Sequence, residues 1–198
     1  LSEISLAINQ FTRRQMDYYD VGLIQTGFGG GEACGLPVKT TTAAGYKVEG
    51  LIKSALAASK CKGAKTDIAS ALKHIATKEL TKNPKTMVVV ITTDKQSCGQ
   101  DLCASAKELV SKSHDIYINV IAYGGSQARA KDFACVTEAG RGEFYRAKTS
   151  ESLYDQIEIS LGKNICPPMA MPCWEKGLSS RSETHRALVV DHCCSLKT

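Results

Sequence analysis

The sequence has no apolar run of transmembrane length, so we expect no membrane-spanning segment. Lysines and arginines give a formal net charge of +5, but they are scattered along the chain. No basic run contains interleaved aromatic residues, and aromatic residues make up only 6% of the chain. We therefore expect no nucleic-acid partner.

Nucleotide-binding and catalytic patterns are also missing. The glycine-rich stretch 27–35, GFGGGEACG, is followed neither by Gly-Lys-Ser/Thr nor by a helix pattern, which argues against a phosphate-binding loop. No conventional catalytic triad is visible. His192 is badly placed to activate Cys193, because adjacent residues of a strand point to opposite faces. We expect a protein that is not an enzyme, and a thiol or metal-dependent enzyme is the disfavoured alternative.

Cysteine, in contrast, is abundant, with nine residues in a chain of 198, and none of the spacings forms a paired C-x-x-C zinc pattern. Positions in loops favour disulfides and an oxidising compartment, so we expect a secreted, extracellular or periplasmic protein. The odd number leaves at least one thiol free or paired between chains. The candidate pairs are Cys98 with Cys103, Cys34 with Cys61, and Cys166 with Cys173.

The stretch 86–103 organises the rest of the chain. Residues 87–91, MVVVI, form a continuous apolar run of strand length, which is typical of a strand covered on both faces of a parallel sheet. The run leads through Thr92 and Thr93 to Asp94, at the carboxyl edge where open α/β sheets bind ligands. Asp101 is the better cap for the next helix, which leaves Asp94 available for a binding role.

Strand and helix patterns alternate along the chain, which predicts an α/β fold with a doubly wound, mostly parallel sheet flanked by helices. The sequences of 19–26 and 37–42 predict two strands that pair as a hairpin. Further strands are expected at 116–123, 142–146 and 186–190, and helices at 1–14, 48–58, 68–80, 104–113, 126–139 and 151–161.

The chain divides into three parts. Residues 1–165 form the domain body, residues 166–185 form a linker rich in cysteine, proline and serine, and residues 186–198 return as a strand that we expect at the centre of the sheet. This last strand ends in Asp191, so that a second aspartate stands at the carboxyl end of a strand.

The order of these motifs resembles the von Willebrand factor A (vWA) domain family. In that family a central strand ends in Asp-x-Ser-x-Ser, a helix start carries a threonine, and a second strand ends in Thr-Asp. The matching residues here are Asp191, Cys193, Ser195, Thr66 and Asp94. The resemblance covers 1–161 and 186–198, and the chain looks most like cysteine-containing secreted or bacterial-type members. It implies a metal-ion-dependent adhesion site for Mg²⁺ or a similar divalent cation, a protein ligand at that face, and a disulfide for Cys135.

The Asp-x-Ser-x-Ser strand is displaced, because in the family it comes first and leads into the helix that matches 1–14. Three explanations stay open: a circular permutation bridged by 166–185, one phase of a tandem or cleaved array, or donation of the last strand to a neighbouring molecule. We favour closure within the chain. Strand exchange is the serious alternative, because a sheet without its central strand has two unpaired edges.

The predicted site departs from the family pattern at two positions. Cys193 replaces a hydroxyl, and a thiol is a poor ligand for Mg²⁺. Lys95 replaces the glycine usual after the second aspartate, and its ammonium would compete with a cation. The expected function is a protein-binding or adhesion module with a weakened metal site. The alternative is a structural subunit that assembles by strand exchange or cysteine pairing.

Overall fold

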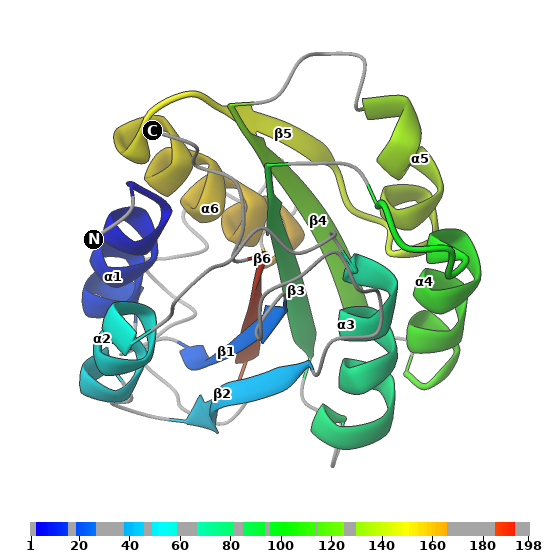
Figure 1. Cartoon of the computed structure of the whole chain (residues 1–198), viewed down its shortest axis with the longest axis horizontal. Helices are drawn as coiled ribbons and strands as arrows, with labels where there is room; N and C mark the ends of the chain where they lie inside the picture. Colours follow the sequence, from blue (N-terminus) through cyan, green and yellow to red (C-terminus); the bar gives the residue numbers. More distant parts are fainter. Residues whose placement is uncertain are drawn as a thin grey trace.

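The computed structural model describes residues 3–15, 19–26, 38–45, 49–58, 67–80, 85–93, 96–113, 115–124, 130–165 and 185–192 (Figure 1). The strands are β1 (Tyr19–Thr26), β2 (Lys39–Gly45), β3 (Thr86–Thr92), β4 (Ile116–Tyr123), β5 (Phe144–Ala147) and β6 (His185–His192). The helices are α1 (Glu3–Gln15), α2 (Glu49–Ala58), α3 (Ile68–His74), α4 (Leu102–Ser111), α5 (Ala130–Ala139) and α6 (Ser150–Ile165). A π-helical turn, η1 (Ile75–Glu79), continues α3.

These strands form one six-stranded sheet in the order β2-β1-β6-β3-β4-β5. The strands β1, β6, β3, β4 and β5 run parallel to one another, and β2 pairs antiparallel with β1. The predicted fold class is therefore confirmed, and so is the predicted hairpin of the first two strands. The two irregularities in the β1–β2 register occur near Leu23.

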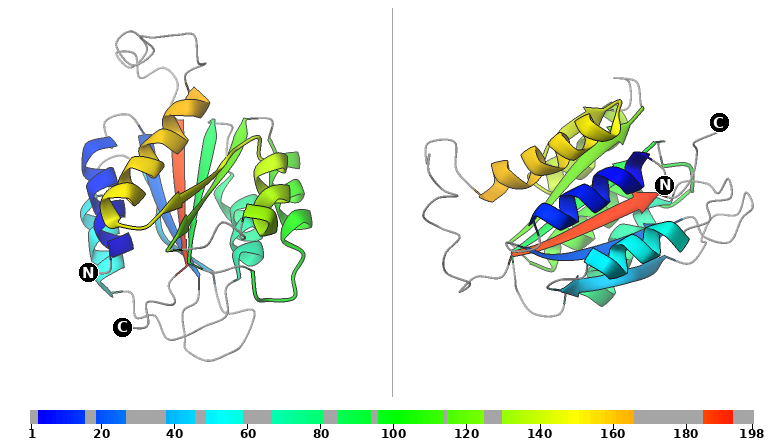
Figure 2. Two further views of the ribbon diagram at one scale, coloured as in Figure 1. Left: turned by 90° about the horizontal axis from the view of Figure 1, so that it is seen from above. Right: turned by 90° about the vertical axis from the view of Figure 1, so that its left-hand side faces the viewer.

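The last strand of the chain lies at the centre of this sheet. Val189 of β6 stands opposite Leu23 of β1 on one side and opposite Val89 of β3 on the other. The single chain thus supplies its own central strand. In both views of Figure 2 the first turn of α1 lies at the same end of the sheet as the carboxyl end of β6, so α1 is placed as if it followed β6 directly.

Two helical layers cover the sheet, and β3 explains why both are needed. Every residue of β3 is buried, with Met87, Val89 and Ile91 facing the layer of α1, α2 and α6. Val88 and Val90 face the layer of α3, α4 and α5 (Figure 1). The continuous apolar run thus reflects burial on both faces, as the sequence predicts.

An aspartate caps the N-terminus of each helix that precedes or follows β3 in the sequence. Asp101 caps α4 by accepting a hydrogen bond from Ala104 N at 2.9 Å, as predicted. Asp67 caps α3 in the same way through Ser70 N at 3.1 Å. A single helix was expected over 68–80, but the α-helix ends at His74 and the π-helical turn η1 follows it. The Thr77 hydroxyl bonds to the carbonyl of Lys73 there, a side-chain contact that competes with regular helix geometry.

No helix in the described ranges is both long and apolar enough to cross a membrane.

A buried asparagine joins β4 to the segments on either side of β5. Asn119 donates from Nδ2 to the carbonyl of Ser160 at 3.0 Å and accepts at Oδ1 from Glu143 N at 2.9 Å. Gly142 passes so close that a Cβ there would lie 2.7 Å from Asn119 Oδ1. Its own N–H donates to the carbonyl of Thr137 at 2.8 Å. This approach requires a residue without a side chain.

We expect Gly142→Ala to lower the free energy of unfolding by about 1–3 kcal/mol, because the new methyl group has to displace Asn119 and the backbone of Ile118. The measurement is urea unfolding followed by circular dichroism. Gly99→Ala is the matched control, since a Cβ there meets nothing within 4 Å. Equal stability of the two variants would contradict the close approach at Gly142.

Candidate functional site

The carboxyl ends of β6 and β3 lie side by side at the centre of the sheet. Asp191 of β6 stands in register opposite Ile91 of β3 and opposite Gln25 of β1. Strand β3 ends at Thr92, two residues before Asp94 in the sequence. The backbone of Asp191 therefore lies beside the strand that leads to Asp94, as predicted.

The five predicted ligands are only partly placed by this structure. Asp191 is described through its backbone alone, and Thr66, Asp94, Cys193 and Ser195 lie outside the described residues. Within the described part, no group of three or more His, Cys, Asp or Glu side chains is arranged to hold a metal ion. The predicted cation site thus stays a prediction.

The chemistry of the predicted donor set nevertheless allows a test of fit. It offers two carboxylates, two hydroxyls and one thiol. Carboxylates and hydroxyls suit hard cations such as Mg²⁺, whereas a thiolate suits a softer ion such as Zn²⁺. The set fits a divalent cation, and its sulfur favours zinc over magnesium.

A side chain that no sequence pattern indicated joins the loop after β3 to the start of α3. Gln96, two residues after Asp94, accepts hydrogen bonds at Oε1 from Ile68 N at 2.7 Å and Ala69 N at 3.3 Å. Its Nε2 donates to Asp67 Oδ1 at 3.3 Å and to the carbonyl of Cys98 at 3.2 Å. A glutamine in a polar loop gives no spacing signal that would have indicated this role.

A second glutamine of the same loop reaches the same helix. Gln100 donates from Nε2 to Ser70 Oγ at 2.9 Å, and Ser70 Oγ donates to Asp67 Oδ2 at 2.8 Å. The loop between β3 and α4 is therefore hydrogen-bonded to the start of α3 at two separate points.

A disulfide follows this loop in α4, with a pairing that the sequence did not predict. Cys103 is bonded to Cys135, with a Cα–Cα distance of 5.5 Å, and the bond joins α4 to α5. The predicted Cys98–Cys103 pair is wrong, because α4 begins at Leu102 and Cys103 lies in a helical turn that packs against α5. Cys98 is also disulfide-bonded, necessarily to a different cysteine.

The other predicted disulfide cysteines, Cys34, Cys61, Cys166 and Cys173, fall in segments that the structure does not describe, and their pairing stays a prediction. The disulfide that the family resemblance implies for Cys135 is confirmed.

A second polar cluster joins edge strand β2 to the π-helical turn. Thr40 Oγ1 lies 2.6 Å from His74 Nε2 and donates to Glu79 Oε1 at 2.5 Å. Because the hydroxyl has only one proton and gives it to Glu79, His74 must donate its own Nε2 proton to Thr40. Such an imidazole cannot act as a base toward Thr40. The cluster holds β2 against the end of α3, and the His74 side chain is partly buried in it.

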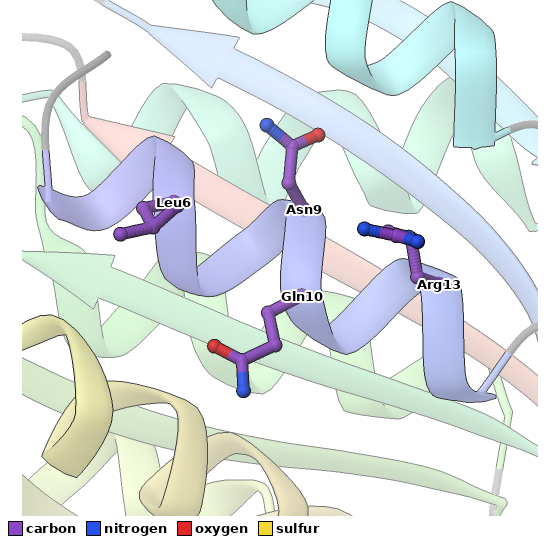
Figure 3. A pocket seen from close by; sticks show the side chains of 4 residues that line it. All are labelled: Leu6, Asn9, Gln10 and Arg13. Carbon is purple, nitrogen blue, oxygen red and sulfur yellow. The ribbon is translucent and has the colours of Figure 1, made fainter.

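A hollow of about 520 Å³ lies on α1, on the opposite face of the sheet from α3 and α4 (Figure 3). Leu6, Asn9, Gln10 and Arg13 line it. The side-chain oxygen of Asn9 is buried there and has no hydrogen-bond partner. This hollow is separate from Gln96 and the loop that contacts α3.

Tyr145 of β5 is the described group with a marked change in acidity. Burial raises the pKa of its phenol well above the usual value, and the negative charge of Glu143 raises the pKa further. Since β3 and β4 separate β5 from β6, this neutral phenol is not part of the carboxyl edge at β6.

The sequence matches no family model and no curated protein. Among solved structures, it is similar to proximal thread matrix protein 1 from the mussel byssus, with a TM-score of 0.61 and 16% identity over 81% of this chain and 43% of that chain. The same mussel protein with a zinc-occupied MIDAS motif gives a TM-score of 0.60 at 16% identity, again over 81% of this chain and 43% of that one.

BatB from Bacteroides thetaiotaomicron matches over 81% of this chain and 87% of that chain at 18% identity, with a TM-score of 0.49, which is too low to support an argument. This chain spans less than half of the mussel protein, 43% of its length. At these identities the likeness shows the fold, which is vWA-like.

We expect a non-reducing digest to yield a peptide that contains Cys103 joined to Cys135. Replacing both residues by alanine should lower the free energy of unfolding by about 3–4 kcal/mol. Without the bond, the unfolded chain is no longer constrained by a loop closed across 32 residues, and its conformational entropy rises. Mass spectrometry checks the linkage and urea unfolding checks the stability. A linked peptide of Cys98 and Cys103 would contradict the structure.

Proposed function

We propose that this chain is an extracellular or periplasmic vWA-type module that binds a protein partner through a divalent cation at the carboxyl edge of β6 and β3. The observation that carries this proposal is the place of β6, whose backbone brings Asp191 beside the strand that leads to Asp94. The vWA-like fold and the motif order in the sequence support it further.

Five residues would hold the cation: Asp191, Cys193, Ser195, Thr66 and Asp94. When bound, the cation would accept a carboxylate of the partner as one more ligand. The role of the chain's own residues is to fix the cation and to leave that position open. Protein binding, without a chemical reaction, is the proposed activity.

The preferred cation in this proposal is Zn²⁺ or an ion of similar softness, with Mg²⁺ bound less tightly. Cys193 stands where the family pattern has a hydroxyl, and sulfur is a good ligand for zinc and a poor one for magnesium. A mussel protein of the same fold has been solved with zinc in its MIDAS motif, which supports this choice. The ammonium of Lys95 would weaken the binding of either ion.

Two features support an oxidising compartment. Cys103 and Cys135 are joined in a disulfide, and Cys98 takes part in another. Disulfides persist in secreted and periplasmic proteins and are rare in the reducing cytosol. The likeness to a protein of the mussel byssus agrees with an extracellular place.

A structural subunit is the second candidate function, and the cysteine count favours it. Nine cysteines cannot all pair within one chain, so at least one is available for a bond to another molecule or remains a thiol. The similar mussel protein is a thread matrix protein, which agrees with such a role. In this case the chains would assemble by cysteine pairing or by exchange of β6, and the cation site would be vestigial.

We expect saturating Zn²⁺ to stabilise the wild-type chain, by about 2.7 kcal/mol at a concentration one hundred times the dissociation constant. Asp94→Ala should abolish this stabilisation because it removes a carboxylate ligand. The measurement is urea unfolding in EDTA and in Zn²⁺. Asp155→Ala, an exposed aspartate on α6, is the matched control and should keep the full response. An unchanged response in Asp94→Ala would refute the proposed site.

The preference between cations should depend on the sulfur. Cys193→Ser restores the oxygen of the family pattern, so the ratio of Zn²⁺ affinity to Mg²⁺ affinity should fall by about tenfold or more. Isothermal titration with each ion measures the ratio. Cys194→Ser is the control and should leave the ratio unchanged. The proposal of a sulfur ligand is wrong if both serine variants behave alike.

A further inference from the structure

We propose that Gln96 is the positioning residue of the cation site, and that it sets the distance between the segments that carry Thr66 and Asp94. The inference rests on the proposed cation site. Gln96 itself is not a proposed ligand, and it acts through the backbone of the two neighbouring segments.

The geometry of Gln96 joins two places that are far apart along the chain. Gln96 lies two residues after Asp94, and Ile68 lies two residues after Thr66. The hydrogen bond from Ile68 N to Gln96 Oε1, 2.7 Å long, spans 28 residues of sequence. Along the chain, the described connection between these two places runs through α3, η1 and β3. The side chain of Gln96 is therefore a short link between them, and the bond from Gln100 to Ser70 is a second one.

The start of α3 offers donors that suit this link. The first N–H groups of a helix have no partner within the helix, and Gln96 Oε1 accepts from two of them, Ile68 N and Ala69 N. The partial positive charge of the helix end strengthens these bonds to a carbonyl oxygen. The N–H groups at the start of α3 thus fix both the distance and the orientation of the Gln96 side chain, and with it the loop.

Asp67 extends the same link to the neighbour of Thr66. Its carboxylate accepts from Ser70 N, from Ser70 Oγ and from Gln96 Nε2, and the residue is only 4% exposed. Gln96 also donates to the carbonyl of Cys98, a residue that is itself held by a disulfide. Residues 67 and 96 are therefore fixed to each other before any cation arrives.

Holding these segments in place matters to a metal site, because metal–ligand distances are allowed to vary only within a narrow range. A site whose ligands come from separate loops binds well only when the loops are held within a few tenths of an ångström of the bound arrangement. Outer residues that orient ligands commonly contribute about 10- to 100-fold to metal affinity. Gln96 is in the position to supply this orientation for Asp94 relative to Thr66.

Gln100 provides a matched control within the same loop. It bonds to Ser70 of α3 through Nε2 at 2.9 Å, so its removal also weakens the contact between loop and helix. It lies six residues after Asp94, however, and does not contact the first N–H groups of α3. A general loss of stability should appear in both variants, whereas a loss of positioning should appear only when Gln96 is changed.

The experiment compares the wild-type chain with Gln96→Ala and Gln100→Ala. We measure Zn²⁺ affinity by titration against a chelator, the absorption spectrum of bound Co²⁺, and stability in EDTA. Gln96→Ala should bind Zn²⁺ about 10- to 100-fold more weakly, with an altered Co²⁺ spectrum. Gln100→Ala should bind within about twofold of wild type and keep its Co²⁺ spectrum, even where it loses stability.

If Gln96→Ala does not fold, Gln96→Asn takes its place, because it keeps the amide but is one methylene too short to reach both Ile68 and Asp67. A wild-type chain that binds neither Zn²⁺ nor Co²⁺ overturns the proposed function, and this inference with it. Wild-type binding with an unchanged Gln96 variant overturns this inference alone. An equal loss of affinity in Gln100→Ala overturns it too, because loop stability would then explain the effect.

Discussion

The structure depends on the hydrogen bonds that β6 makes on both of its edges. Strand β6 pairs with β1 over residues 185–192 and with β3 over residues 186–191. Without it, β1 and β3 would each expose an unpaired edge, and the apolar run of β3 would lie beside a gap. The two helical layers pack on the faces of this sheet, and the described core residues of β1 and β3 stand on either side of the backbone of β6.

Local signals in the sequence predicted the elements and the architecture. The run 87–91 predicts a buried parallel strand because both faces are covered, and Asp101 predicts the start of α4 because its side chain caps the helix. The central place of β6 followed from the resemblance in motif order to the vWA family. For the site, the sequence predicted that Asp191 and the end of β3 meet, and the backbone register agrees.

Contacts between distant side chains could not be predicted. The pairing of Cys103 with Cys135 depends on how α4 packs on α5, whereas spacing alone favoured the neighbouring Cys98. Gln96 reaches α3 across 28 residues, and no local pattern marks a loop glutamine as a helix cap. The contact of His74 with Thr40 likewise depends on the fold of the hairpin. Each of these contacts exists only once the sheet has formed.

Closure of the sheet and formation of the proposed site are one event, because the strand that completes the sheet also carries Asp191. The segment 166–184 joins α6 to this strand in the sequence, so folding must insert the residues after α6 between β1 and β3. If β6 instead entered a neighbouring molecule, Asp191 of one chain would stand beside the end of β3 of another. Cation binding would then depend on protein concentration, since the ligands would come from two chains. Insertion of β6 thus bears on both candidate functions, because it places Asp191 at the proposed site and, by exchange, would join two chains.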